Sequence, residues 1–214
     1  MEILIEYALI ESAKKTDTAS LPMVGSMCRK GIAEIKEDHA ASFGFTQIHR
    51  VLFEIEPNHQ SLEEYLESLD PQSLTDLIDQ PDDRGRSALV CAVEYGWYDA
   101  VRTLVRFGAN VNQQRVGDEN GLSLLHLAFA GPPQRETLEI AGFLIKKGVN
   151  VDARDSDGWT PLLIAVSWKN FDALPELIGA GAELTTISYD GEDAVSLSGD
   201  VGILGKIKAI IAVS

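Results

Sequence analysis

Apolar residues along this chain are arranged in short runs that alternate with polar, glycine-containing turns. Three such runs each follow a turn at a similar distance and occupy residues 88–92, 124–128 and 161–165. Further along, apolar residues recur at helical spacing until another glycine, such as Gly108 or Gly181, which typically ends a helix in the left-handed conformation. The pattern therefore predicts pairs of short helices separated by turns.

Four glycines mark the same place in four imperfect copies of one segment, and these are Gly85, Gly121, Gly158 and Gly191. They are spaced 36, 37 and 33 residues apart. Such a period is typical of repeat proteins, in which each copy is one supersecondary unit that cannot bury its apolar face alone. The copies are therefore expected to stack on one another as a solenoid.

Two segments carry a likeness to a known repeat. Residues 157–162 read Asp-Gly-Trp-Thr-Pro-Leu, and residues 107–112 read Phe-Gly-Ala-Asn-Val-Asn. They resemble the opening and the end of an ankyrin repeat. The resemblance implies an all-α ankyrin-repeat solenoid of stacked helix-turn-helix units, joined by β-hairpin fingers that carry the four glycines and preceded by a helical cap. The chain also looks similar to the ankyrin arrays of fungal multidomain proteins.

A fifth, more degenerate copy precedes the others. Residues 43–51 align with the same opening, and Ser61 with Glu64 three residues later marks a helix start. We expect a helical N-terminal cap at 1–42 and an array at 43–214, with repeats 1 to 5 at about 43–81, 82–117, 118–154, 155–187 and 188–214. Repeat 3 carries a four-residue insertion within 131–135, placed between its two helices. Pro175 is expected to kink the second helix of repeat 4.

Composition and charge narrow the class of protein. With 45% hydrophobic residues and no apolar stretch long enough for a membrane span, the chain is expected to fold as a soluble array without membrane contact. Its net charge of −15, from 33 acidic and 18 basic residues, disfavours nucleic acid as a partner and favours a basic or amphipathic protein. Cys28, Cys91 and an amino terminus unlike a targeting segment predict a reducing location, in the cytoplasm or the nucleus.

Motifs for catalysis or for cofactor binding are absent from the sequence. The glycines within 199–205 lack the Lys-Ser or Lys-Thr ending of a phosphate loop, and no histidine has zinc-ligand spacing. By the resemblance, His49 and His126 stitch neighbouring backbone segments together. Asp82 and its neighbour Asp83 are expected to support a turn. We therefore predict a non-enzymatic protein that uses no cofactor and no metal.

The resemblance places partner contacts on the concave side, which is formed by the fingers and the first helices. Projected onto this chain, the usual contact positions are Asp83, Arg84, Arg86, Glu94, Tyr95, Glu119, Asn120, Leu122, Asp157, Trp159, Trp168, Tyr189, Asp190 and Glu192. The four aromatic residues of this set are expected to line one groove rimmed by carboxylates. Exposed tyrosine and tryptophan are typical binding anchors. The prediction is an interaction module that binds a protein partner in this groove.

Two other functional hypotheses stay open. In one, the groove binds a small molecule or acts as an enzyme, with Asp157, Asp190, Glu192 or Glu94 as acid or base. In the other, the array is a structural spacer. The apolar residues 207–213 near the carboxyl end favour self-association through that face, or continuation of the array in a longer protein.

Overall fold

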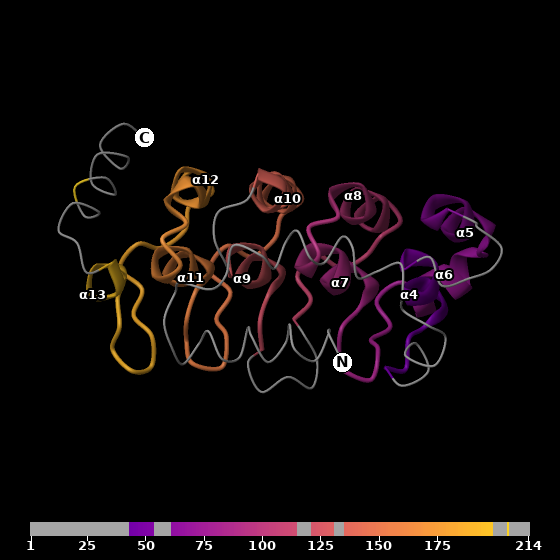
Figure 1. Ribbon diagram of the computed structural model, residues 1–214, viewed down its shortest axis with the longest axis horizontal. Helices are drawn as coiled ribbons and strands as arrows, with labels where there is room; N and C mark the ends of the chain where they lie inside the picture. The colour runs from indigo at the N-terminus through magenta and orange to yellow at the C-terminus, as the bar shows by residue number, and fades with distance from the viewer. Residues whose placement is uncertain (1–42, 54–60, 115–120, 131–134, 199–204, 206–214) are drawn as a thin grey trace.

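The computed structural model describes residues 43–53, 61–114, 121–130, 135–198 and 205. The helices in these ranges are α4 (Gln47–Leu52), α5 (Leu62–Ser68), α6 (Pro71–Leu77), α7 (Ala88–Glu94), α8 (Tyr98–Arg106), α9 (Leu124–Phe129), α10 (Arg135–Lys146), α11 (Pro161–Ser167), the short η2 (Phe171–Ala173), α12 (Leu174–Gly179) and α13 (Ala194–Ser198). In Figure 1, the first helices α7, α9 and α11 form one row, and the second helices α8, α10 and α12 form a parallel row. The fingers extend from the other side of the first row. The described chain is an all-α array of stacked repeats, as predicted.

The first helix of each inner repeat begins at a capping residue two positions after the finger glycine. Ser87 before α7 accepts a hydrogen bond from the Val90 backbone N–H at 3.2 Å, and Thr160 before α11 accepts one from Leu163 at 3.4 Å. Both caps have an extended backbone, so the helix starts abruptly after them. A hydroxyl cap stabilises a helix by about 1 kcal/mol. The spacing from glycine to hydroxyl therefore sets where each first helix begins.

The first helices form the core because they are apolar on nearly every side. Leu89, Leu125 and Leu162 are at most 1% exposed, and each lies four residues after its finger glycine. Helix α9 packs against both α7 and α11, and α11 packs against α13. Burying a leucine side chain contributes about 1.5–3 kcal/mol. The repeats therefore share one continuous core rather than folding as separate units.

The fingers are tight loops rather than paired strands. Gly158, for example, has a φ of +78°, in the left-handed region that favours glycine. Within the described residues, strand-like pairing is limited to isolated antiparallel bridges, Gln114 with Ser123 and Ile187 with Asp193. In the fingers of repeats 3 and 5 the predicted β-hairpin is thus reduced to a single bridge.

The second helices differ from repeat to repeat. Helices α8 and α10 have 9 and 12 residues, and the chain turns after them at Gly108 and Gly148, where φ is +98° and +82°. In repeat 4 the second helix is divided into the 3-10 turn η2 and the six-residue α12, with Pro175 in the first turn of α12. A proline there removes no helical hydrogen bond. Pro175 therefore marks the start of a shortened helix instead of kinking a long one.

Repeat 1 contains a helix that the sequence analysis missed. Helix α5 starts at the predicted capping box, in which the Ser61 and Glu64 side chains each accept the other's backbone N–H. Helix α6 follows, capped by the Asp70 carboxylate and begun by Pro71. An aspartate followed by proline is a helix-start signal. The segment between α5 and the next finger is therefore largely helical.

Several predictions fall on residues outside the described ranges. These are the cap at 1–42, Cys28, the insertion at 131–134 and the apolar segment at 207–213. Helix α9 ends at Phe129 and α10 begins at Arg135, on either side of the insertion. The division into a cap and five repeats stays a prediction. In the described part of the chain, no helix combines the length and apolarity that crossing a bilayer requires.

Candidate partner-binding surface

Hydrogen bonds between neighbouring repeats recur in the loops that follow α6, α8, α10 and α12, which we call the outer loops. In each, a side-chain oxygen of one repeat accepts the backbone N–H of a residue in the next repeat. The pairs are Asp79 with Asn110 at 3.0 Å, Asn112 with Asn150 at 2.7 Å and Asp152 with Glu183 at 2.9 Å. We call this series the boundary ladder. Because each bond crosses a repeat boundary, the ladder keeps the outer loops in register with the helices.

Backbone hydrogen bonds also connect neighbouring fingers. The Asp83 N–H donates to the Phe43 carbonyl at 3.0 Å, and the Tyr189 N–H donates to the Asp157 carbonyl at 2.9 Å. In both pairs, the residue two positions before a finger glycine binds the residue just before the preceding finger glycine. The finger tips therefore present their side chains at a fixed spacing.

His49 and His126 join a first helix to the next finger, as the resemblance implied. The Nε2–H of His126 donates to the Trp159 carbonyl at 3.0 Å, while its Nδ1 accepts the Ser123 backbone N–H at 3.2 Å. His49 Nε2 donates in the same way to the Arg86 carbonyl at 2.9 Å. Burial lowers the pKa of both rings below the ordinary histidine value, so both are neutral near neutral pH.

Arg86 is buried, so the prediction that it lies on the exposed concave surface is wrong. Its guanidinium donates to the Asp82 carboxylate at 2.8 and 3.0 Å and reaches Glu94 at 3.5 Å. Asp82 Oδ1 also accepts the backbone N–H groups of Arg84 and Arg86, which holds the turn as predicted. Burial alone would lower the pKa of Arg86, but the neighbouring Cys91 and the two carboxylates raise it above its ordinary value. Arg86 therefore stays charged and stabilises the finger.

A histidine, a carboxylate and a thiol lie together beneath the finger of repeat 2. Ligand atoms of His49, Asp82 and Cys91 are within 4.8 Å of one another, and all three residues are buried. Both ring nitrogens of His49 are engaged, by Thr46 Oγ1 and by a backbone carbonyl, and Asp82 is paired with the Arg86 guanidinium. A metal cation here would displace these bonds beside an existing positive charge. The three residues form a hydrogen-bonded structural network. Their spacing in the sequence did not predict that they lie together.

Tyr95 belongs to an aromatic cluster in the first two repeats. The cluster consists of the stacked or edge-on rings of Phe45, Phe53, Tyr95 and Trp97. Contacting rings have centroids 5.0–5.5 Å apart. Phe53 is 2% exposed, and the other three are half-buried. Trp97 therefore packs within the protein, as predicted, and Tyr95 shares in that packing.

The aromatic residues of repeats 4 and 5 differ in exposure. Trp159 is half-buried against the core, and Trp168 at the end of α11 is also half-buried. Tyr189 is 71% exposed, more than any other large apolar side chain in the described part of the chain. Among the described residues, no ring contact joins these three to one another or to Tyr95. A single groove lined by all four rings stays a prediction.

Asp157, Tyr189 and Asp190 lie together at the fingers of repeats 4 and 5, and we call them the finger surface. Both carboxylates are exposed, and no ion pair in the described ranges engages either one. The Tyr189 ring lies against the backbone of Gly158, where an added side-chain carbon would stand 2.8 Å from the ring. The finger surface thus has an aromatic centre and an acidic rim.

Other predicted contact residues are spread along the array. Asp83 is exposed, and the half-buried positions are Arg84, Glu94, Leu122 and Glu192. Glu119 and Asn120 lie outside the described residues. Their part in binding stays a prediction.

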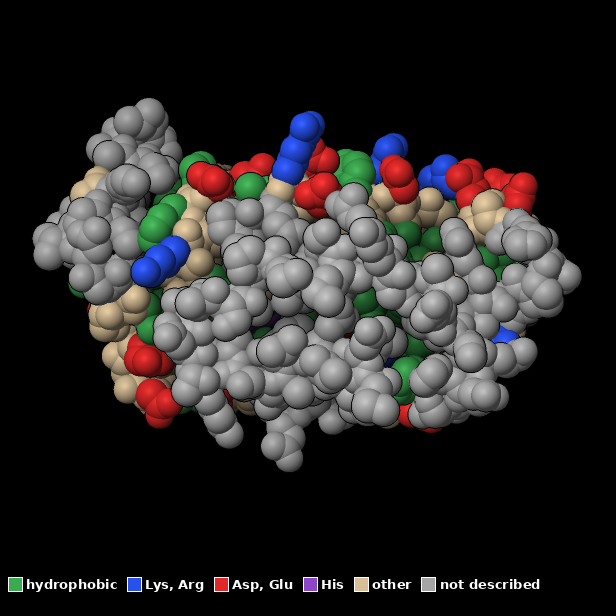
Figure 2. Space-filling model, viewed as in Figure 1, with side chains coloured by type: hydrophobic (Ala, Val, Ile, Leu, Met, Phe, Trp, Pro, Cys, Tyr) green, Lys and Arg blue, Asp and Glu red, His purple; other side chains and the backbone are tan. Residues whose placement is uncertain are grey.

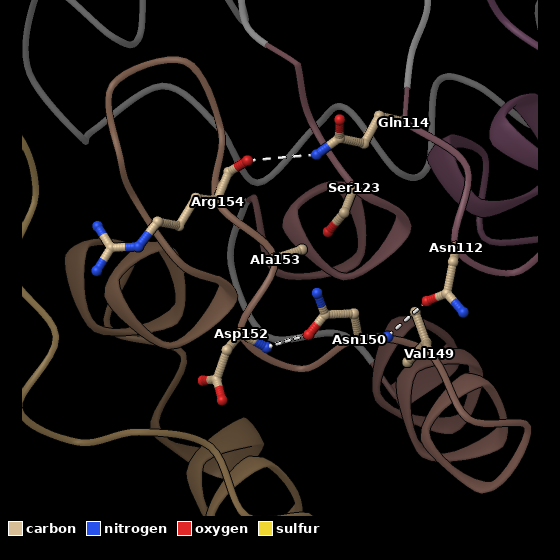
Figure 3. Close-up of a pocket in the computed structure, with 8 residues that line it drawn as sticks. All are labelled: Asn112, Gln114, Ser123, Val149, Asn150, Asp152, Ala153 and Arg154. Atoms are coloured by element: carbon tan, nitrogen blue, oxygen red, sulfur yellow. Dashed lines mark hydrogen bonds between the residues drawn. The ribbon is translucent and has the colours of Figure 1, made fainter.

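A pocket of about 260 Å³ lies where the loop that ends repeat 2 meets the loop that ends repeat 3. Figure 3 shows its lining residues, Asn112, Gln114, Ser123, Val149, Asn150, Asp152, Ala153 and Arg154. Gln114 Nε2 donates to the Arg154 carbonyl at 3.3 Å, and the Asn112 to Asn150 bond of the boundary ladder also borders the pocket. None of the predicted contact residues lines it. The pocket therefore gives no support to a small-molecule site in the aromatic groove.

Two family models match parts of this array. Residues 84–115 match the model described as ankyrin repeat, and residues 134–194 match the model described as ankyrin repeats in many copies. The chain contains ankyrin repeats. The ankyrin matches coincide with α7 and α8, and with α10 to α12.

Curated relatives are similar to about half of the chain. Neurogenic locus notch homolog protein 2 of Homo sapiens is 33% identical over 117 residues, which are 54% of this chain and 4% of the relative. RelA-associated inhibitor of Mus musculus is 35% identical over 109 residues, 50% of this chain and 12% of the relative. Transient receptor potential cation channel subfamily A member 1 of Homo sapiens is 29% identical over 120 residues, 56% of this chain and 10% of the relative.

The chain therefore spans only a small part of the length of the relatives it matches. The three named relatives are animal proteins, and the likeness to fungal arrays stays a prediction.

Proposed function

We propose that this ankyrin array is a protein-interaction module whose finger surface binds a protein partner. The observation that carries the proposal is the 71% exposure of Tyr189 on a backbone fixed by its hydrogen bond to the Asp157 carbonyl. A tyrosine held in this way loses little conformational freedom on binding, and tyrosine is enriched among the residues that dominate binding energy. Ankyrin repeats generally mediate protein–protein interaction, which agrees with this role.

The charge of the surface favours a basic partner. The exposed carboxylates of Asp83, Asp157 and Asp190 lie at the fingers of repeats 2, 4 and 5, and the whole chain has a net charge of −15. Figure 2 shows acidic side chains at the finger below α13, and further acidic and basic side chains along the opposite edge, over the second helices. Complementary charge accelerates association and excludes partners of the same sign. The same charge disfavours nucleic acid and anionic membranes.

The contact extends in this proposal from the finger surface along the concave side. It includes the predicted positions other than the buried Arg86, namely Asp83, Arg84, Glu94, Tyr95, Glu119, Asn120, Leu122, Trp159, Trp168 and Glu192. Most of the described members are half-buried. We therefore expect them to contribute less binding energy than Tyr189, as residues around a hot spot do.

Binding rather than catalysis is the proposed activity. The name of RelA-associated inhibitor states that this relative associates with RelA and inhibits. By analogy, the present chain acts by binding a partner protein. In this proposal it uses no cofactor and no metal, and it acts in the cytoplasm or the nucleus.

The test is affinity capture from a lysate of the source cells with the immobilised full chain. The finger variant carries Asp157→Asn, Tyr189→Ala and Asp190→Asn. The control variant carries Asp76→Asn and Asp99→Asn, which remove the same amount of charge from exposed helical positions. We expect a protein that is retained by the wild type and by the control but is lost from the finger variant.

Circular dichroism and urea unfolding first establish that the three proteins are equally folded. Recovery of the same proteins by all three forms would refute the finger surface as the binding site. If the captured protein were also lost from the control variant, the interaction would be explained by unspecific charge attraction.

A further inference from the structure

Two finger junctions in the described part of the chain share one backbone arrangement. At the junction of repeats 1 and 2, the Asp83 N–H donates to the Phe43 carbonyl. At the junction of repeats 4 and 5, the Tyr189 N–H donates to the Asp157 carbonyl. In both, the donating residue also lies over the glycine of the preceding finger. The side chains of the two junctions can therefore be compared position by position.

The first junction holds an arginine against an aromatic ring. The guanidinium carbon of Arg84 lies 3.9 Å from the centroid of the Phe43 ring. A planar guanidinium on a ring face is attracted by the electrons of the ring. Asp83, which precedes Arg84 in the sequence, adds a carboxylate to the same junction. The first junction thus combines a ring, a carboxylate and an arginine.

The second junction has two carboxylates where the first has the stacked pair. Asp157 directly precedes its finger glycine, as Phe43 does, and Asp190 directly precedes the next one, as Arg84 does. Because the side chains at the counterpart positions are in contact in the first junction, Asp157 and Asp190 occupy neighbouring positions in the second. Both are exposed, and the ion pairs found among the described residues include neither. A cation placed between these carboxylates would be attracted by both.

The ring of the second junction, Tyr189, has one flat face covered and the other open. An added side-chain carbon on Gly158 would stand 2.8–2.9 Å from three consecutive ring atoms, Cγ, Cδ1 and Cε1, so the flat face of the ring covers the glycine. The side chain is nevertheless 71% exposed. Within the described ranges, no ring and no cation lies against it. Figure 2 shows acidic side chains of this finger at the surface below α13.

Arg154 lies near the second junction but does not take the place of the stacked arginine. Its Nη1 donates to the backbone carbonyls of Gly158 and Ile187, both at 3.1 Å. These bonds hold its charge beside the finger backbone, and it forms no ion pair with a carboxylate of the described residues. The two exposed carboxylates therefore keep their capacity to accept hydrogen bonds from a further cation.

We infer that the finger surface recognises an arginine side chain of the partner protein. Its guanidinium stacks on the open face of Tyr189 and donates to the carboxylates of Asp157 and Asp190. Arginine fits this combination because its planar group can stack on a ring and present several N–H donors at once, whereas the lysine ammonium is a compact, strongly hydrated point charge. The inference rests on the proposed function, since it names the group that the finger surface binds.

The test uses acetylated and amidated pentapeptides of glycine and serine that differ only in the central residue, which is arginine, lysine or citrulline. Citrulline has nearly the shape of arginine without its charge. Each peptide is titrated to about 10 mM into the ¹⁵N-labelled full chain at about 0.05 M salt, and NMR follows the backbone amide shifts of the two fingers. We expect the arginine peptide to give saturable shifts with a dissociation constant on the order of 1 mM. The lysine peptide should bind at least about fivefold more weakly, and the citrulline peptide should not saturate.

Two substitutions of Tyr189 separate the ring from its hydroxyl. Tyr189→Phe keeps the ring face, so the arginine peptide should bind within about twofold of the wild-type affinity. Tyr189→Leu keeps an apolar side chain but has no ring face, so we expect at least about fivefold weaker binding and no remaining preference for arginine over lysine. Circular dichroism first establishes that the variants are folded as the wild type is.

A second pair of variants tests the carboxylates. Asp157→Asn combined with Asp190→Asn should weaken binding of the arginine peptide at least about fivefold. The control with Asp76→Asn and Asp99→Asn removes the same amount of charge elsewhere and should bind the peptide within about twofold of the wild type.

Several results would overturn the inference. These are equal affinity for the arginine and lysine peptides, unchanged arginine binding by the Tyr189→Leu variant, and the absence of saturable shifts in the fingers. Capture of a partner that depends on the finger surface, without a preference for arginine, would leave the proposed function standing and remove this inference. Conversely, arginine-selective binding at the fingers without any captured partner would support this inference and refute the proposed protein partner.

Discussion

The Tyr189 ring packs directly on the backbone of Gly158, the glycine of the preceding finger. A side-chain carbon added to Gly158 would lie 2.8 Å from Tyr189 Cδ1, and the Tyr189 N–H donates to the adjacent Asp157 carbonyl at 2.9 Å. Asp83 stands in the same relation to Gly44, with its carboxylate over the glycine and its N–H bonded to the Phe43 carbonyl. The glycines therefore serve two purposes, since they form the turn and admit the residue of the next finger.

Gly158→Ala should destabilise the protein more than Gly191→Ala does. Both glycines have a positive φ, +78° and +82°, so each substitution costs about 1–2 kcal/mol of backbone strain. Nothing lies within 4 Å of a side-chain carbon at Gly191, whereas the one at Gly158 would meet Tyr189. We expect an additional loss of about 1–3 kcal/mol in the free energy of unfolding for Gly158→Ala, measured by urea denaturation.

The Tyr189→Ala background supplies the control for this prediction. Without the ring, Gly158→Ala and Gly191→Ala should destabilise the protein by equal amounts. A difference that persists in that background would show that the contact with Tyr189 is not its cause.

Lys169→Gly should stabilise the protein. Lys169 has a φ of +56°, and it lies eleven residues after its finger glycine, where repeat 2 has Gly96 at +70°. A lysine in this conformation carries strain that glycine does not, so we expect the free energy of unfolding to rise by about 1 kcal/mol. Lys169→Ala keeps the strain and should change stability by less than about 0.5 kcal/mol. Equal effects of the two substitutions would contradict this explanation.

Asp82→Asn should be strongly destabilising, although it preserves the shape of the side chain. It leaves the buried Arg86 guanidinium without the carboxylate that holds it at 2.8 Å, and loss of one member of a buried pair costs about 3–5 kcal/mol. Asp83→Asn, at the exposed neighbouring position, should change the free energy of unfolding by less than about 0.5 kcal/mol. Thermal and urea unfolding of the two variants test this contrast, and similar small losses would show that the ion pair is unimportant.

His126→Leu should destabilise the protein at about pH 7.5 but much less at about pH 5.5. Leucine fits this position, because Leu163 occupies it in repeat 4 at 0% exposure. Near neutral pH the substitution removes the His126 hydrogen bond to the Trp159 carbonyl, which keeps only the Asp155 backbone N–H at 3.0 Å, a loss of about 0.5–1.5 kcal/mol.

The pH dependence follows from the lowered pKa of His126 in the folded protein. Below the unfolded value of about 6.5, the unfolded chain binds a proton that the folded chain rejects, so wild-type stability declines as the pH falls. The leucine variant lacks this group, and the gap between the two free energies of unfolding should narrow. A gap that stays constant between the two pH values would contradict the assignment of a neutral, buried His126.

The repeat architecture could be predicted because it depends on the spacing of residues that are close together in the sequence. The distance from Gly158 to Thr160 places both the turn and the helix cap, and the run at 161–165 is apolar enough to require burial. The resemblance to the ankyrin repeat correctly assigned His126 to a backbone link between repeats. These features depend on residues close together in the chain or on a period that repeats.

Features that depend on stacking could not be read in this way. The register placed Arg86 at a surface position, but Asp82 and Glu94 draw its side chain inward across the finger. Tyr189 was recognised as a contact residue, whereas its packing on Gly158 arises only when two fingers meet. Val195 matches Leu162 in the pattern and differs from it in exposure, because what packs beyond a helix is not encoded in the helix itself.

The central claim is tested most directly by the dissociation constant between the purified chain and a captured partner, measured by isothermal titration calorimetry for wild type and Tyr189→Ala. If the finger surface is the binding site, removal of this 71% exposed ring should raise the dissociation constant at least about tenfold, or about 1.4 kcal/mol. A dissociation constant within about twofold of the wild-type value, in a variant folded as well as the wild type, would contradict the claim.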